Sequence, residues 1–102
     1  MKTYTKMDIV RAVSDKLSLS EVKTKEMVES VLEAMTLILT EDRSNTRIEL
    51  RNFGVFEVKP TKAKPRARNP RANVEVYVPP RRKVHFKAGK KLRDVLKKEW
   101  AL

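Results

Sequence analysis

The chain has 102 residues, with 24 Lys and Arg against 13 Asp and Glu, so its formal net charge is +11. It contains no cysteine, one histidine and two glycines, which excludes a disulfide scaffold, thiolate and histidine metal sites and a glycine-rich nucleotide loop. The length favours a single domain over residues 1–102. We expect no cofactor, no metal and no catalytic activity, because no constellation of residues could perform a reaction.

The basic residues gather in the second half of the chain. Residues 1–50 contain 8 basic and 9 acidic side chains, whereas residues 51–102 contain 16 and 4. Between residues 59 and 91 there are 12 basic residues, one acid and all five prolines. Such a stretch is either a solvated or disordered segment, because like charges repel, or an ordered surface for a polyanion. The regular alternation of its residues favours the ordered surface.

Two helices are predicted at the N-terminal end. Thr5 and Asp8 resemble a capping box with Asp in place of Glu, so a first helix should begin near Lys6. Apolar residues at helical spacing carry this helix to about Ser18, and Ser20 offers the N-cap of a second helix. The first helix should therefore pack through one apolar stripe.

The second helix is apolar on nearly all sides. Between Met27 and Leu39, nine of thirteen residues are apolar, and the polar ones lie on one narrow strip. Two helices and a short sheet within roughly 80 compact residues cannot cover such a helix. A membrane helix is excluded, because the run is far shorter than about 18 residues and contains Glu29 and Glu33. The missing cover is expected to be another chain, which makes the protein an obligate dimer.

A strand, a tight turn and a second strand should follow. Ile48 and Leu50 alternate with charged residues, and apolar residues resume after a break at residues 52–54. We expect Gly54 to adopt a positive φ in this turn, because glycine does so without steric penalty. Phe53 and Phe56 border apolar strand residues, which makes them core anchors rather than platforms for stacked bases.

The most informative segment is a basic strand with a regular period. Basic residues occupy every second position from residue 62 to residue 68, and these are Lys62, Lys64, Arg66 and Arg68. A period of two predicts that all four cations lie on one face of an extended edge strand. Residues 74–78 alternate as a returning strand, after a turn in which Asn73 can take the left-handed conformation. The two strands form a ribbon arm, about residues 59–81, with its tip at residues 68–71.

A third helix is predicted near the C-terminus from apolar residues at helical spacing, which are Leu92, Val95, Leu96 and Trp100. The cations Lys90, Lys91 and Arg93 lie near its N-terminus. They oppose the helix macrodipole there, but together with free N–H groups they could hold a phosphate. His85 is assigned no role, because neither a nucleophile nor a metal partner accompanies it.

Three motifs, in order and at nearly their usual spacing, resemble those of the HU and integration host factor family of bacterial nucleoid proteins. They are Phe53-Gly54-Val55-Phe56, Arg68-Asn69-Pro70 and Phe86-Lys87-Ala88-Gly89-Lys90-Lys91-Leu92. The resemblance spans essentially the whole chain. It implies an α+β fold, namely an intertwined dimer with a helical body, a small antiparallel sheet and protruding β-ribbon arms that embrace DNA in the minor groove. The tip proline, here Pro70, is implied to be the intercalating wedge between base pairs.

The resemblance also implies DNA contacts. Near the wedge, Arg68, Asn69 and Arg71 would contact the groove. On the body, Lys87, Lys90 and Arg93 would hold phosphates. Together with the basic strand and the basic run after residue 80, the predicted DNA-binding residues are Lys62, Lys64, Arg66, Arg68, Asn69, Pro70, Arg71, Arg82, Lys83, Lys87, Lys90 and Arg93.

The arm also departs from the family pattern, including at Val78-Pro79-Pro80. Ala67 and Asn73 stand where the family usually has glycine. The stretch between Phe56 and Arg68 is one residue longer than usual. This extra residue affects the register of the cations between residues 62 and 66.

The expected function is that of a nucleoid-associated architectural protein in the bacterial cytoplasm. A dimer would carry about +22, twice the charge of the chain, and would bind duplex DNA strongly and largely independently of sequence. It would bend the duplex by proline wedging at the arm tips and help to compact the chromosome. The expected partners are double-stranded DNA and a second chain, either an identical copy or a paralogue, and no membrane.

Two other classes of function stay open on the sequence. A ribosomal-type RNA-binding protein can also combine a small body with a basic hairpin, but A-form RNA needs no apolar wedge, so kinking of duplex DNA separates the two. A protein-interaction module with an incidental basic face would keep its partner after DNase treatment. Within the family, non-specific packaging and site-selective bending are not separated, because selectivity comes largely from DNA deformability.

Overall fold

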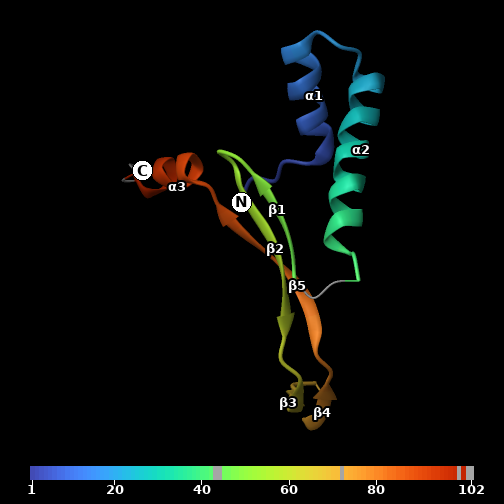
Figure 1. The fold of residues 1–102 in the computed structure, drawn as a ribbon, viewed down its shortest axis with the longest axis vertical. Helices are drawn as coiled ribbons and strands as arrows, with labels where there is room; N and C mark the ends of the chain where they lie inside the picture. The colour runs from blue at the N-terminus through green and yellow to red at the C-terminus, as the bar shows by residue number, and fades with distance from the viewer. Residues whose placement is uncertain (43–44, 72, 99, 101–102) are drawn as a thin grey trace. The chain divides into compact units, whose positions relative to one another are not determined.

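The computed structural model describes residues 1–42, 45–71, 73–98 and 100. Its helices and strands follow the order α1, α2, β1, β2, β3, β4, β5, α3 (Figure 1). The chain divides into two compact units, residues 1–37 and residues 38–102. Helices and an antiparallel sheet confirm the predicted α+β class, and the assignment of residues 1–102 to one domain stays a prediction.

The first unit begins with α1, Lys6–Leu17, where the sequence predicted it. The carboxylate of Asp8 accepts hydrogen bonds from the backbone N–H of Thr5 at 2.7 Å and from the Thr5 hydroxyl at 3.1 Å. These bonds lower the pKa of Asp8, with the backbone bond as the largest cause and the nearby Arg11 as a further one. The helix ends at Ser18, whose φ of 54° is left-handed.

The second helix, α2, spans Glu21–Leu39 and begins after the predicted cap Ser20. The Ser20 hydroxyl accepts the N–H of Lys23 at 3.2 Å, and its backbone carbonyl accepts the Thr24 hydroxyl at 2.8 Å. Val10 on α1 and Thr24 on α2 are both fully buried. An ion pair of 2.9 Å between Lys6 and Glu29 also joins α1 to α2.

The second unit is built on a three-stranded antiparallel sheet of order β1-β2-β5, formed by Thr46–Leu50, Gly54–Thr61 and Arg81–Ala88. The register aligns Ile48, Phe56 and Phe86 in one row. The next row aligns Arg47, Glu57 and His85. Because successive side chains of a strand point to opposite faces, the sheet has an apolar face and a charged face.

The apolar face contains a cluster of three phenylalanine rings. The Phe86 ring lies 4.8 Å from the Phe56 ring and 5.4 Å from the Phe53 ring, between centroids. Phe53 and Phe56 therefore pack as predicted for core anchors, although the Phe53 side chain is still 50% exposed.

The turn between β1 and β2 corrects one expectation. Asn52, not Gly54, has the positive φ, at 69°. Gly54 is required for a different reason. A Cβ atom at this position would lie 2.5 Å from the Lys87 carbonyl oxygen and 2.6 Å from the Phe86 ring. The glycine therefore lets β2 and β5 approach each other closely.

The C-terminal helix α3 spans Lys90–Lys97, with Gly89 as its N-cap. The predicted extension to Trp100 is wrong, because the helical hydrogen bonding ends with the N–H of Lys98 donated to Val95. Trp100 is 83% exposed. None of the helices that the structure describes is long and apolar enough to cross a membrane.

Candidate nucleic-acid interface

The predicted arm is present as a two-stranded antiparallel ribbon (Figure 1). Its strands are β3, Lys64–Asn69, and β4, Val74–Val78. The ribbon prolongs β2 and β5: Thr61 pairs with Arg81 at the end of the sheet, and Lys64 pairs with Val78 in the same register beyond it.

One extra residue in β3 shifts the register within the arm. Lys64 pairs with Val78, but Arg68 pairs with Glu75, so β3 has one more residue than β4 between these two pairs. An extra residue on one strand is a β-bulge. Val78 and Glu75 point to opposite faces of β4. Their partners on β3, Lys64 and Arg68, therefore also lie on opposite faces of the ribbon.

The predicted single stripe of cations is therefore wrong. Lys62 precedes β3, in the short link after β2. Lys64 shares a face with the valines of β4, whereas Arg68 shares the other face with Glu75. Period-two alternation assumed a regular strand, and the bulge between residues 64 and 67 breaks that assumption.

The tip of the arm is a hydrogen-bonded turn that presents Pro70. The side-chain oxygen of Asn69 accepts the N–H of Arg71 at 3.0 Å, and the Asn69 carbonyl accepts the N–H of Asn73 at 2.7 Å. Asn73 has the expected left-handed conformation, with a φ of 53°. Pro70 and Arg71 are exposed and Asn69 is half-buried. The turn thus fixes an apolar ring at the end of a charged ribbon.

The cations of the arm carry no ion pair to any other residue that the structure describes. This holds for Lys62, Lys64, Arg66, Arg68 and Arg71, all of which are exposed. Their charge is therefore fully available to an anion from outside the chain.

The strand β5 carries three of the predicted residues on two different faces. Lys83 and Lys87 lie on the charged face of the sheet, because each is two residues from His85. Arg82 lies on the opposite face, and its guanidinium donates a hydrogen bond of 2.6 Å to the Glu41 carbonyl. Arg82 is thus already engaged within the unit, whereas Lys83 faces outward from the charged face.

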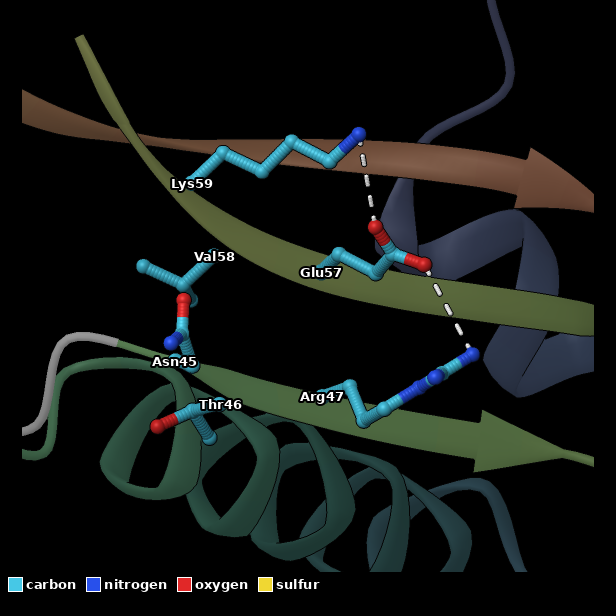
Figure 2. Close-up of a pocket in the computed structure, with 6 residues that line it drawn as sticks. All are labelled: Asn45, Thr46, Arg47, Glu57, Val58 and Lys59. Carbon is cyan, nitrogen blue, oxygen red and sulfur yellow. Dashed lines mark ion pairs between the residues drawn. The ribbon is translucent and has the colours of Figure 1, made fainter.

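The charged face is organised around Glu57, as Figure 2 shows for two of its partners. The Glu57 carboxylate lies 3.4 Å from the Lys59 Nζ, 3.6 Å from an Arg47 guanidinium nitrogen and 3.6 Å from the Lys87 Nζ. Its side chain is only 16% exposed, whereas the three cations are 46–57% exposed. Burial acts to raise the pKa of Glu57, but Lys87, Lys59 and Arg47 together outweigh it and lower the pKa.

Sequence reasoning missed Arg47 and Lys59, and it gave Glu57 no role. The signal was present, because charged residues alternate with apolar ones along both β1 and β2. The register between these strands is needed to bring the three charges together.

The helix α3 places two further predicted residues at the surface. Lys90 is its first residue and Arg93 lies one turn later, and both are exposed. The guanidinium of Arg93 lies 4.0 Å from the carboxylate of Asp94. Among the described residues, no group of three or more His, Asp or Glu side chains could hold a metal ion.

Comparisons with known proteins agree with this architecture. The model of the family described as bacterial DNA-binding protein matches residues 4–97. The chain is 42% identical over 98 residues to integration host factor subunit alpha of Haemophilus influenzae, covering 96% of this chain and 98% of that relative. It is 33% identical to DNA-binding protein HU-1 of Halalkalibacterium halodurans, covering 89% and 97% of the two chains. The Anabaena HU chain in an HU–DNA cocrystal structure is similar with a TM-score of 0.81, at 28% identity, over 94% of this chain and 100% of that chain.

Proposed function

The chain belongs to the family of bacterial DNA-binding proteins that contains HU and integration host factor, and we propose that it works as an architectural protein of the bacterial nucleoid. It binds duplex DNA in the minor groove, bends the duplex at the arm tip and helps to organise the chromosome in the cytoplasm. The chemistry of its exposed residues supports this proposal.

The observation that carries the proposal is the combination of free cations with an exposed proline on one thin ribbon. The arm is two strands wide, and none of its cations is paired with another described residue. The narrow minor groove has a negative potential that attracts such cations. Their binding releases condensed counterions, which gives affinity that depends on salt and little on sequence.

Pro70 contributes shape rather than charge. Insertion of apolar side chains between base steps is the known mechanism of minor-groove architectural proteins, a class that includes HU and integration host factor. A proline ring suits this role because its φ is fixed near −65° and its side chain is rigid. Unstacking costs a few kcal/mol per step and is offset by contacts that only bent DNA makes. In this chain the bonds to Asn69 hold the turn that presents the ring.

The predicted body contacts complete the path of a bent duplex. Lys83 and Lys87 on the charged sheet face, and Lys90 and Arg93 on α3, are proposed to bind phosphates. These contacts position the DNA but carry no sequence information themselves. Arg82 is the weakest of the predicted contacts, because it would have to leave the Glu41 carbonyl to bind a phosphate.

A second chain is proposed to cover the apolar surface of residues 1–37. An open groove between α1 and α2 is lined by Ile9, Val13, Met27, Val28, Val31 and Leu32. Val31 is 59% exposed in the single chain and Met27 is 46% exposed. An exposed apolar surface of this kind marks a protein interface. Relatives named as subunits alpha and beta of integration host factor suggest either an identical copy or a related subunit as the partner.

End-to-end fluorescence transfer on a short linear DNA duplex tests the proposal. We expect the wild type to bring the duplex ends together at saturating concentration. Pro70→Ala removes the wedge and no charge, so the bend should shrink while the affinity for random duplex changes by less than about threefold. Pro80→Ala is the matched control, because Pro80 is an exposed proline between β4 and β5, away from the tip. Its bend should equal that of the wild type.

Two outcomes would contradict the proposal at different levels. A wild type that does not bind duplex DNA, or that prefers an A-form RNA duplex of the same length, would remove the architectural function. A wild type that bends DNA, with an unchanged bend in Pro70→Ala, would leave Pro70 as a turn residue and remove only the wedge.

A further inference from the structure

We propose that Glu57 is a positioning residue that competes with DNA phosphates for Lys87, Lys59 and Arg47, and thereby limits the affinity of the charged sheet face for DNA. The inference rests on the proposed function, because it concerns how strongly that function is exerted. It assigns a role in DNA binding to an acidic residue and adds two cations, Arg47 and Lys59, to the predicted phosphate contacts.

The geometry places one carboxylate within reach of three cations from three strands. Glu57 lies on the central strand β2, Arg47 on β1 and Lys87 on β5, while Lys59 follows on β2 itself. All three nitrogen–oxygen distances fall between 3.4 and 3.6 Å. The carboxylate is largely buried and the cations are about half exposed, so the cations can turn toward solvent while Glu57 stays in place.

The charges of this cluster have two opposite effects on DNA binding: the cations attract phosphates, and the carboxylate of Glu57 holds the cations back. Glu49 also contacts Arg47, at 3.3 Å, so two negative charges face three positive charges and a net charge of +1 remains for an external anion. Each lysine or arginine that binds a phosphate must, however, give up part of its attraction to Glu57. His85 is opposite Glu57 in the register and Lys83 lies on the same face, but neither forms an ion pair with a carboxylate among the described residues. The restraint therefore acts on Lys87, Lys59 and Arg47.

The arm provides the internal contrast. Its cations have no ion pair within the described part of the chain, so binding a phosphate breaks no bond inside the protein. Equal numbers of cations on the arm and on the charged face should therefore contribute unequally to affinity. The difference should disappear when Glu57 loses its charge.

Glu57→Gln tests the inference directly by fluorescence anisotropy with a random DNA duplex over a series of KCl concentrations. Glu57→Gln frees Lys59 and Lys87 and leaves Arg47 with Glu49 as its partner, so we expect binding to tighten by roughly five- to tenfold. The control is Glu49→Gln, which removes the same charge from the same sheet face. Glu49 contacts Arg47 at 3.3 Å but neither Lys59 nor Lys87 among the described residues. We expect it to tighten binding by no more than about twofold.

The same pair of substitutions is then repeated in a Lys87→Ala background. If Glu57 acts by holding Lys87, the gain from Glu57→Gln should shrink at least twofold there, because one of the restrained cations is gone. The gain from Glu49→Gln should not change. Thermal unfolding followed by circular dichroism verifies that each variant is folded at the temperature of the binding assay.

A further comparison uses no substitution of Glu57 and so does not depend on the folding of that variant. Lys87→Ala should weaken binding less than Lys90→Ala, because Lys87 is held by Glu57 whereas Lys90 carries no ion pair among the described residues. Equal gains from the two Glu→Gln variants, an undiminished gain without Lys87, or a larger loss for Lys87→Ala than for Lys90→Ala would each overturn the inference. Absence of duplex binding by the wild type would instead refute the proposed function.

Discussion

The two units of the chain leave opposite kinds of surface uncovered. Residues 1–37 contain six basic and six acidic residues, so the formal charge of +11 belongs entirely to residues 38–102. In the first unit the exposed groove between α1 and α2 is lined by apolar side chains alone. In the second unit the exposed arm is lined by cations without ion pairs to described residues.

This difference teaches that exposure by itself does not identify a partner. An apolar groove is covered by another apolar surface, because burial of apolar area supplies the free energy of association. A cationic ribbon binds a polyanion, because in that case the release of counterions supplies the free energy of association. We therefore expect the first unit to bind protein and the second to bind DNA, so substitutions in each should affect different measurements.

The largest effect is expected for a charge placed in the apolar groove. Val31→Asp would bury an unpaired carboxylate at the proposed interface, which costs several kcal/mol of a total stability of about 5–15 kcal/mol. We expect loss of the dimer, and of most helical circular dichroism, at micromolar concentration. Sedimentation velocity measures the first and far-ultraviolet spectra the second.

The matched control for this substitution is Val22→Asp. Val22 is 82% exposed on the same helix and does not line the groove. Its variant should stay dimeric with an unfolding temperature close to that of the wild type. If Val31→Asp is as dimeric and as stable as Val22→Asp, the apolar groove is not the interface.

The next effect concerns the close approach of β2 and β5, which holds the charged face together. Gly54→Ala places a Cβ against a backbone oxygen that cannot move easily, so we expect a loss of about 1–3 kcal/mol in the free energy of unfolding. Gly89→Ala is the control. Its Cβ would lie 3.0 Å from the nearest atom, the backbone carbonyl carbon of Phe53, so the strain should be smaller than at Gly54. Urea unfolding at fixed protein concentration ranks the two. Equal stabilities would show that β2 and β5 can separate without penalty.

A smaller effect distinguishes free cations from engaged ones within the second unit. Arg68→Ala removes an unpaired arm cation, so the slope of log affinity against log salt should fall by about 0.9. Arg82→Ala removes an arginine bonded to the Glu41 carbonyl, so the slope should change less and the unfolding temperature more. Anisotropy titrations and thermal unfolding of the two variants measure both quantities. Identical changes in slope would mean that Arg82 leaves Glu41 on binding.

Local features of the fold could be predicted from the sequence because their causes are local. The capping residues Thr5 and Ser20 fix where α1 and α2 begin, because the Thr5 carbonyl accepts the N–H of Asp8 and the Ser20 hydroxyl accepts the N–H of Lys23. The alternation of residue types along residues 62–68 and 74–78 predicted the strands of the arm, because this pattern too depends only on neighbouring residues. The dimer was inferred from the composition of residues 27–39, since too little chain was present to bury that helix.

The expectations that failed depend on contacts between distant residues. The need for Gly54 depends on the carbonyl of Lys87, more than 30 positions away. The faces of Lys64 and Arg68 depend on which β4 residues they oppose, and one extra residue reversed the predicted result. The cluster around Glu57 depends on the register of three strands. No periodicity within a single segment contains that information.

The smallest predicted effect is the part of the pH dependence of stability that comes from two carboxylates of the helical unit, Asp8 and Glu29. Hydrogen bonds from Thr5 lower the pKa of Asp8, and a bond and charge from Lys6 lower that of Glu29. A carboxyl group with a lowered folded-state pKa stabilises the fold above its unfolded-state pKa, near 3.8 for Asp8, and this contribution is lost as the pH falls through the folded-state value. Between pH 6 and pH 3, the unfolding temperature should therefore fall more steeply for the wild type than for Asp8→Asn.

Asp15→Asn is the control, because the Asp15 carboxylate forms no ion pair with a described residue. The unfolding temperature of this variant should depend on pH as that of the wild type does. If Asp8→Asn follows the wild type as well, the capping carboxylate contributes nothing to the acid sensitivity of the protein, and the lowered pKa values of Glu29 and Glu57 account for it.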